Sequence, residues 1–356
     1  MANVTYTVPN KNGSYDGDMV VKQYTSVNID AGDIVTVDQP CRGIFILSQG
    51  DVNINGEIRM KGLGAFADPT ASGGSDNNPV QSSGLQFPFR TSGGSTTFTA
   101  ANTLLNGCGT TARSVIANFK TLASDGTVLT VVRQGANGGA TTGVNNTGNN
   151  GSAGSTGQSG GGGSGACNYV GSGGAGAYGS CFSGGSGGGP GDNGTGTAGA
   201  NWGGAGGNGS TAHGATGSGG AGNPNGSDYA TGGGGLELGH INGHGGTEGT
   251  GGLVIIVAGG NVTIGSNGKI DCRGGQSKHV FGKTEWSATG GGSGGGNIII
   301  AHKGTYTNNG EVTCAGGPAG RLYTGTYGYG GTEMSGTYTR RGGDGGTGSV
   351  QTLQII

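Results

Sequence analysis

The residue types best suited to binding another molecule gather between positions 320 and 343. This Gly-rich stretch combines aromatic and basic side chains, namely Tyr323, Tyr327, Tyr329, Tyr338, Arg321, Arg340 and Arg341. Aromatic faces stack on sugars or become buried at interfaces, and arginine donates directional hydrogen bonds. We predict that these residues, together with Trp202, bind a receptor or an interface. The alternatives are packing against a neighbouring subunit and an ordered loop without a ligand.

Carboxylates are the second group that could do chemistry. Polysaccharide-cleaving enzymes built from stacked β-strands use a cluster of carboxylates as general acid and base. The 19 Asp and Glu residues of this chain are spread thinly, and the repeated segments expose only isolated ones such as Asp271 and Glu311. We expect these two to lie solvated at the edge of the fold. The sequence therefore predicts a protein that is not an enzyme.

Other motifs have simpler explanations. His240, His244 and Glu237 are metal-ligand types, but their spacing suits a helix and the segment is interrupted by Gly. Gly282-Lys283-Thr284 lacks the earlier Gly and the strand-to-helix context of a phosphate-binding loop. Arg-Gly-Gly at Arg273 and Arg341 resembles nucleic-acid-binding tails, yet the net charge is -2. No regular Thr ladder of an ice-binding protein is visible. We predict no metal, no cofactor and no nucleic acid.

Glycine dominates the composition, with 93 of 356 residues, and limits the fold class. Each Gly in a regular element costs roughly 0.5–1 kcal/mol relative to Ala, so an ordered state must depend on dense backbone hydrogen bonding. Collagen is excluded because Gly does not recur at every third position. Only 10% of residues are charged, unlike a typical disordered chain. An ordinary helical or α/β enzyme is therefore not expected.

Internal repetition predicts how such a chain folds. Residues 253–275 and 297–317 are near twins, and residues 44–62 fit the same template of an apolar strand, a Gly corner, an alternating strand and an Asn-Gly turn. Stacked copies bury a continuous column that one copy alone cannot. We predict an all-β, solenoid- or sandwich-like body in which Ile54 lies close to Ile264 and Val312. Open ends of such a body favour a homo-oligomer.

We divide the chain into four parts. Residues 1–66 carry N-terminal strand repeats, 67–133 form an irregular insertion with one short helix at 112–123, 134–252 are Gly-rich, and 253–356 carry C-terminal repeats that stack on the N-terminal ones. The Gly-rich part is either a flexible linker or a packed set of polyglycine-II-like helices, and its aromatic residues favour packing. Cys272 and Cys314 occupy equivalent positions, so we expect buried, stacked thiols, with a disulfide as the alternative.

One segment carries a resemblance to known proteins. Residues 40–58, Pro-Cys-Arg-Gly-Ile-Phe-Ile-Leu-Ser-Gln-Gly-Asp-Val-Asn-Ile-Asn-Gly-Glu-Ile, resemble the opening of Gly-rich tail-fibre-associated and other virion proteins of tailed bacteriophages. The Gly-rich middle is similar in style to phage adhesins whose fibre tips contain layered polyglycine helices. In those adhesins the glycine layers carry loops that contact bacterial receptors.

The resemblance implies a virion component that is assembled in the host cytoplasm and released by lysis. This fits an N-terminus without the features of a signal peptide and a chain without an apolar run that could enter a membrane. The leading hypothesis is a tail-fibre or tip adhesin that binds a bacterial surface saccharide or an outer-membrane protein. The alternative is a structural piece, such as a head fibre, decoration protein or tail-fibre connector, whose partners are other virion proteins.

Overall fold

The structure of the protein is a computed structural model. It describes residues 3–11, 13, 16–65, 249–276, 292–318 and 344–354, and the backbone of strands at 85–88, 128–131, 280–281, 321–323 and 338–341. Every regular element in these residues is a strand, which confirms the all-β class for this part of the chain. The expected helix at 112–123 and most of the Gly-rich part lie outside the described residues.

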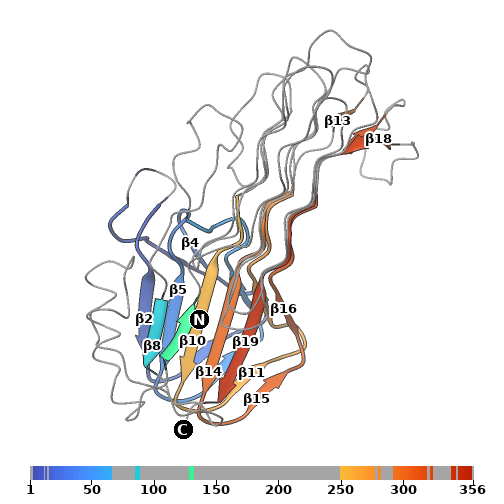
Figure 1. Cartoon of the computed structure of the whole chain (residues 1–356). Coiled ribbons are helices and arrows are strands. Elements are labelled where there is room, and N and C mark those ends of the chain that lie inside the picture. Colours follow the sequence, from blue (N-terminus) through green and yellow to red (C-terminus); the bar gives the residue numbers. More distant parts are fainter. Residues whose placement is uncertain are drawn as a thin grey trace.

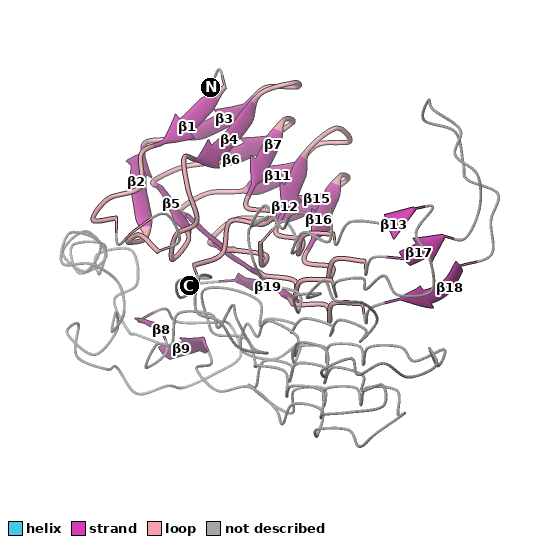
Figure 2. Cartoon of the chain, turned by 90° about the horizontal axis from the view of Figure 1, so that it is seen from above, coloured by secondary structure: helices cyan, strands magenta, loops and turns pink. Residues whose placement is uncertain are grey.

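Most described strands belong to successive units of three short strands each, which are visible side by side in Figure 2. They are unit 1, β2 (Val20–Tyr24), β3 (Val27–Ile29) and β4 (Ile34–Val37); unit 2, β5 (Ile44–Ser48), β6 (Val52–Ile54) and β7 (Glu57–Arg59); unit 3, β10 (Leu253–Ala258), β11 (Val262–Ile264) and β12 (Lys269–Asp271); and unit 4, β14 (Asn297–His302), β15 (Tyr306–Asn308) and β16 (Glu311–Thr313).

The first, second and third strands of the units form three separate parallel sheets. The first-strand sheet has the order β19-β14-β10-β5-β2, where β19 is Ser349–Gln354. The second-strand sheet has the order β15-β11-β6-β3, and the third-strand sheet has the order β1-β4-β7-β12-β16, where β1 is Val4–Tyr6. Each unit thus adds one strand to each sheet, and neighbouring units are held together by backbone hydrogen bonds along all three (Figure 1).

Units 2 and 3 are direct neighbours although residues 60–252 separate them in sequence. Ile54 pairs with Ile264 between β6 and β11, and Ile58 pairs with Ile270 between β7 and β12. Ile270 in turn pairs with Val312 of unit 4. The predicted proximity of N-terminal and C-terminal repeats is therefore present in the structure. The described strands from both ends of the chain share common sheets, while the proposed divisions at 67–133 and 134–252 stay predictions.

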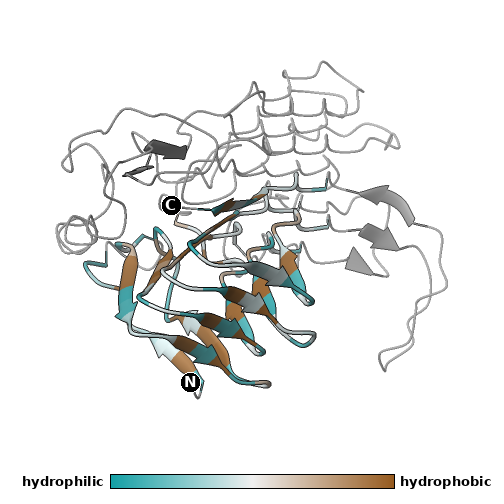
Figure 3. Ribbon diagram, turned by 90° about the horizontal axis from the view of Figure 1, so that it is seen from below, coloured by the Kyte–Doolittle hydropathy of each residue, from teal (hydrophilic) through white to brown (hydrophobic). Residues whose placement is uncertain are grey.

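The core is a column of apolar side chains enclosed by the three sheets. Alternation with period two places Val262 and Ile264 of β11 inside, with 0% exposure, and leaves Thr263 between them on the outer face. Figure 3 shows apolar and polar positions alternating along these strands. The first-strand sheet differs, because β5, β10 and β14 are buried at every position on both faces. Its continuous apolar sequences follow from that double burial.

The corner between the first and second strands explains a recurring Gly. The side chain of Asp51 accepts a hydrogen bond from the backbone N–H of Asn261 at 2.7 Å, and the side chain of Asn261 accepts one from Thr305 N–H at 2.8 Å. These side-chain oxygens occupy the space that a Cβ at Gly260 or Gly304 would need. Gly at this corner therefore lets a side chain of one unit cap the backbone of the next.

The N-terminal segment closes one end of the column. Tyr6 and Val8 are 7% and 2% exposed, and the Tyr6 hydroxyl is 2.6 Å from that of Tyr24. Burial, followed by the contact with Tyr24, raises the pKa of Tyr6 far above its ordinary value. Arg42 donates two hydrogen bonds to the Asp16 carboxylate, at 3.0 and 2.9 Å, and so fastens the loop before β2 to the stack.

The structure contains more of the repeat than the sequence predicted. Unit 1 lies within the strand repeats predicted for residues 1–66, but the repeat template of the sequence covers only residues 44–62 of this part, and unit 1 has the turn Asp30-Ala31-Gly32-Asp33 in place of Asn-Gly. The pairing of Val27 with Val52 and of Ile29 with Ile54 assigns it to the same stack. At the other end, β19 continues the first-strand sheet beyond unit 4. Two strands, β8 (Leu85–Pro88) and β9 (Val128–Val131), form an antiparallel pair within the insertion expected to be irregular.

Candidate functional site

All long insertions of the stack leave from the same corner, between the third strand of one unit and the first strand of the next. The connection from β4 to β5 is short, residues 38–43, but the later ones span residues 60–252, 272–296 and 314–348. In repeat proteins, insertions that leave from one side of the stack are often the binding face. We call this side the insertion corner. The sequence alone did not identify it, because the corner is defined only when the strands are assigned to sheets.

Extended Gly segments carry the chain away from this corner and bond to one another. Gly251 N–H donates to Gly294 at 2.9 Å, and Gly295 N–H donates to Gly346 at 2.9 Å. Ser293 lies between two further segments, since its N–H donates to Gly275 and its carbonyl accepts from Gly317. Residues 292–296 therefore bond to neighbours on several sides, and not only to two as in a sheet.

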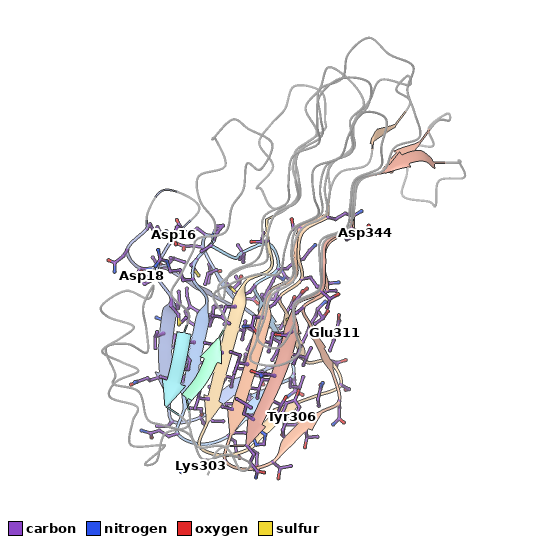
Figure 4. All side chains as sticks on the ribbon, in the orientation of Figure 1. Asp16, Asp18, Lys303, Tyr306, Glu311 and Asp344 are labelled. Carbon is purple, nitrogen blue, oxygen red and sulfur yellow. The ribbon has the colours of Figure 1, made fainter. Side chains whose placement is uncertain are left out.

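Close approach of these segments excludes side chains from them. A Cβ added at Gly292, Gly295, Gly317 or Gly348 would overlap a backbone carbonyl oxygen of an adjacent segment. Only Gly allows backbones to approach this closely at such points. The insertions therefore start from a tightly hydrogen-bonded base, and Asp344 lies on this side of the molecule, opposite Lys303 and Tyr306 at the other end of the strands (Figure 4).

Five of the eight predicted binding residues lie on one pair of strands beyond that base. β17 (Arg321–Tyr323) pairs antiparallel with β18 (Tyr338–Arg341), and β13 (Val280–Phe281) pairs parallel with β17. The register places Arg321 opposite Arg341, Leu322 opposite Arg340 and Tyr323 opposite Tyr338. This small sheet combines two insertions and lies apart from the three large sheets (Figures 1 and 2). Tyr327, Tyr329 and Trp202 lie outside the described residues.

The charged residues of the third-strand sheet form a ladder across units 2, 3 and 4. Glu57, Lys269 and Glu311 share one register position, and Arg59 pairs with Asp271 at another. Asp271 accepts hydrogen bonds from the Arg273 side chain at 2.9 and 2.6 Å, and Lys269 Nζ lies 3.4 Å from Asp271 and 3.3 Å from Glu311. The carboxylates therefore alternate with cations across the face of the sheet.

The expectation that Asp271 lies solvated is wrong, whereas Glu311 is exposed as expected. The Asp271 side chain is only 2% exposed and that of Glu311 is 54% exposed. Burial acts to raise the pKa of Asp271, but the hydrogen bonds and charge of Arg273 and the charge of Lys269 together hold that pKa below its ordinary value. A carboxylate kept ionised by two cations stabilises the stack and is poorly suited to act as a general acid.

Cysteine side chains line the interior beside the insertion corner. Cys272 and Cys314 are buried, unbonded and at successive positions of neighbouring units, because Cys272 N–H donates to Thr313. Burial, followed by the contact with Cys314, raises the pKa of Cys272 well above its ordinary value. Burial also raises the pKa of Cys41 to about 12. These neutral thiols act as small apolar groups, and the disulfide alternative is not present.

The metal-ligand and phosphate-loop motifs of the sequence form no site among the described residues. No group of three or more His, Cys, Asp or Glu side chains suited to a metal ion occurs among them. His240, His244, Glu237 and Gly282-Lys283-Thr284 lie outside them. In the same part of the chain there is no helix long and apolar enough to cross a membrane.

No protein family model, no curated protein and no solved structure matches the chain. The functional assignment therefore depends on the arrangement of its own residues.

The edge of β19 is a second surface that the sequence did not indicate. β19 is the last strand of its sheet in the described residues, and its sequence, Ser-Val-Gln-Thr-Leu-Gln, carries no charge. Val350 is 40% exposed, whereas the residues before it in the same column are nearly or fully buried: Val20 at 2% and Ile44, Val254 and Ile298 at 0%. An uncharged edge strand is a template for pairing with another chain.

Proposed function

We propose that the body is a parallel β-solenoid whose Gly segments pack in the manner of polyglycine II. The solenoid is supported by the in-register pairing of each unit with the next in three sheets. The polyglycine packing is supported by the bonds of residues 292–296 to segments around 251, 275, 317 and 346. The strand pairing and the glycine packing both stabilise the fold through backbone hydrogen bonds. A chain with 93 glycines requires this, because it has few apolar side chains to bury.

We further propose that the protein is a non-enzymatic bacteriophage virion component, a tail-fibre or tip adhesin that presents its insertions to a host receptor. The observation that carries this proposal is the departure of all three long insertions from one corner of a rigid stack. A rigid scaffold with loops gathered on one side is a common design for recognition. The receptor is a bacterial surface saccharide or an outer-membrane protein, and the protein acts on the virion.

A structural role in the virion is the second candidate, and the open edge of β19 favours it. A head fibre, decoration protein or connector must pair with other virion subunits or with further copies of itself. The uncharged strand and the exposed Val350 suit the addition of a strand from such a partner. In this case the insertions pack against virion proteins and not against the host.

Adsorption of the purified chain to bacteria distinguishes the adhesin function from the structural role. Labelled protein is incubated with a panel of strains that includes the host, and cell-bound fluorescence is measured after washing. An adhesin binds host cells at saturable levels and reduces phage adsorption in competition, whereas a structural component does neither. Thr352→Lys, which places a charge on the β19 edge, is the matched control: it should leave adsorption by an adhesin unchanged but impair incorporation of a structural component into particles.

A further inference from the structure

The pairing of β17 with β18 places two positive charges at one position of the sheet. Arg321 and Arg341 are directly opposite each other, and Arg340 is opposite Leu322 in the adjacent pair. Residues at directly opposite positions of an antiparallel pair are close neighbours on one face, so like charges there are destabilising. An anion bound at this register position would offset the repulsion.

The local charge of the segment agrees with this reading. Residues 320–343 contain three Arg and one Glu, Glu333, so their formal charge is 3 - 1 = +2, while the whole chain carries -2. The remaining Arg residues that the structure describes with side chains, Arg42, Arg59 and Arg273, bond to carboxylates of the stack. The described arginines of the body are therefore paired with carboxylates, whereas residues 320–343 carry an excess of positive charge.

A pair of aromatic residues follows the arginines along the same two strands. Tyr323 is opposite Tyr338, with a shift of register between Leu322 and Tyr323. Tyrosine combines a flat apolar face with a hydroxyl, which suits contact with a sugar ring. The hairpin thus places the arginine pair and the tyrosine pair at register positions that the Leu322–Arg340 pair separates.

We propose that the β17–β18 hairpin binds an anionic saccharide, whose phosphate or carboxylate group is recognised at the register position that Arg321 and Arg341 share. The planar guanidinium matches either group in bidentate geometry, and two of them around one oxyanion give directional recognition that a lysine pair would not. Arg340 alternates with Arg341 along β18 and therefore belongs to the opposite face of the hairpin, while Tyr323 and Tyr338 share a register position two residues further along β17. This inference rests on the proposed adhesin function and names the class of its receptor.

The test compares the full-length chain with Arg321→Gln/Arg341→Gln and with Arg321→Lys/Arg341→Lys. Binding is measured to immobilised lipopolysaccharide before and after chemical dephosphorylation, to alginate as a carboxylated polysaccharide, and to neutral dextran. We expect the wild-type chain to bind phosphorylated lipopolysaccharide, alginate or both, and to bind dextran at least tenfold more weakly. Loss of binding after dephosphorylation of the lipopolysaccharide identifies phosphate as the recognised group, and binding to alginate identifies carboxylate. The Gln pair should lose at least tenfold in affinity and the Lys pair should lose less, since it keeps the charge.

The matched control is Arg59→Gln/Lys303→Gln, which removes an equal number of positive charges, two, from the body of the stack. It should bind like the wild type, and thermal unfolding should show that every variant is folded. Equal binding to anionic and neutral surfaces, or unchanged binding by the Gln pair, would overturn the inference. If wild-type protein still adsorbs to host cells in that case, the adhesin proposal stands without it. Failure to adsorb to any strain would instead remove the adhesin proposal itself.

Discussion

At the scale of single residues, paired charges connect neighbouring units of the stack. Asp271 accepts hydrogen bonds from Arg273 and pairs in register with Arg59 of unit 2, while Lys269 contacts Asp271 and also Glu311 of unit 4. Because Asp271 is nearly inaccessible, its cations replace the water that an exposed carboxylate would keep. Removing the charge of Asp271 therefore lowers the free energy of unfolding more than removing the charge of Glu311, because water solvates the Glu311 carboxylate.

We expect Asp271→Asn to lower the free energy of unfolding at pH 7 by about 1–3 kcal/mol, because two cations lose their partner. The pKa of Asp271 is depressed in the folded protein. Its contribution is therefore complete above the unfolded value near 4, and it is lost as pH falls through the lower folded value. Urea unfolding of both proteins from pH 7 to pH 2 should show the difference shrinking in acid.

Glu311→Gln serves as the control in the same network, with an expected loss of about 0–1 kcal/mol. A difference between wild type and Asp271→Asn that stays constant down to pH 2 would contradict the assigned role of the Asp271 charge.

At the scale of elements, the Gly segments and the short strands are two forms of the same backbone pairing. The strands bond to neighbours in the plane of a sheet and hide alternate side chains in the core. The Gly segments of residues 292–296 and 314–317 carry few side chains, so they approach neighbours on several sides. The change from one form to the other occurs where each unit ends, next to Cys272 and Cys314.

Gly317→Ala tests how tightly the Gly segments pack. The added methyl group would overlap the carbonyl oxygen of Gly275, which is backbone and cannot rotate away. We expect a loss on the order of 3 kcal/mol in the free energy of unfolding, measured by urea titration. Ser266→Ala, at an exposed turn of unit 3, should change it by no more than about 0.5 kcal/mol. Equal stability of the two variants would mean that the segments are loosely packed.

At the scale of the whole molecule, strands from both ends of the chain complete one column. Units 1 and 2 come before residues 60–252 and units 3 and 4 come after them, yet all four share each sheet. The column is covered at its N-terminal end by Tyr6 and Val8 and ends at β19 with an exposed Val350. The two ends therefore differ, because the N-terminal segment covers one and the other exposes the edge of β19.

A double-mutant cycle tests this shared column. Ile54→Ala and Ile264→Ala should each cost about 2–5 kcal/mol, because both side chains are fully buried. Their paired positions predict an interaction energy of about 0.5–3 kcal/mol in the double variant, from chemical unfolding. Ile54→Ala combined with Val350→Ala should be additive within about 0.5 kcal/mol. Additivity of the first pair would place the two repeats in independent folding units.

Repetition and alternation are properties of the sequence that predicted much of the fold. Residues 44–62, 253–275 and 297–317 indicated strand positions and buried faces, because period-two alternation and Gly corners depend on local backbone geometry. The stacking of Ile54 on Ile264 followed from the similarity of the units. The Tyr and Arg cluster of residues 320–343 was likewise identified from composition, and the register places five of its seven members on one hairpin.

Other features depended on contacts between units, which sequence spacing does not encode. The burial of Asp271, the open edge of β19 and the opposition of Arg321 to Arg341 all follow from the sheet to which each strand belongs and from its register. The common corner of the insertions has the same origin. Local backbone preference determined the units of this protein, and hydrogen bonding between distant units decided which of their residues meet.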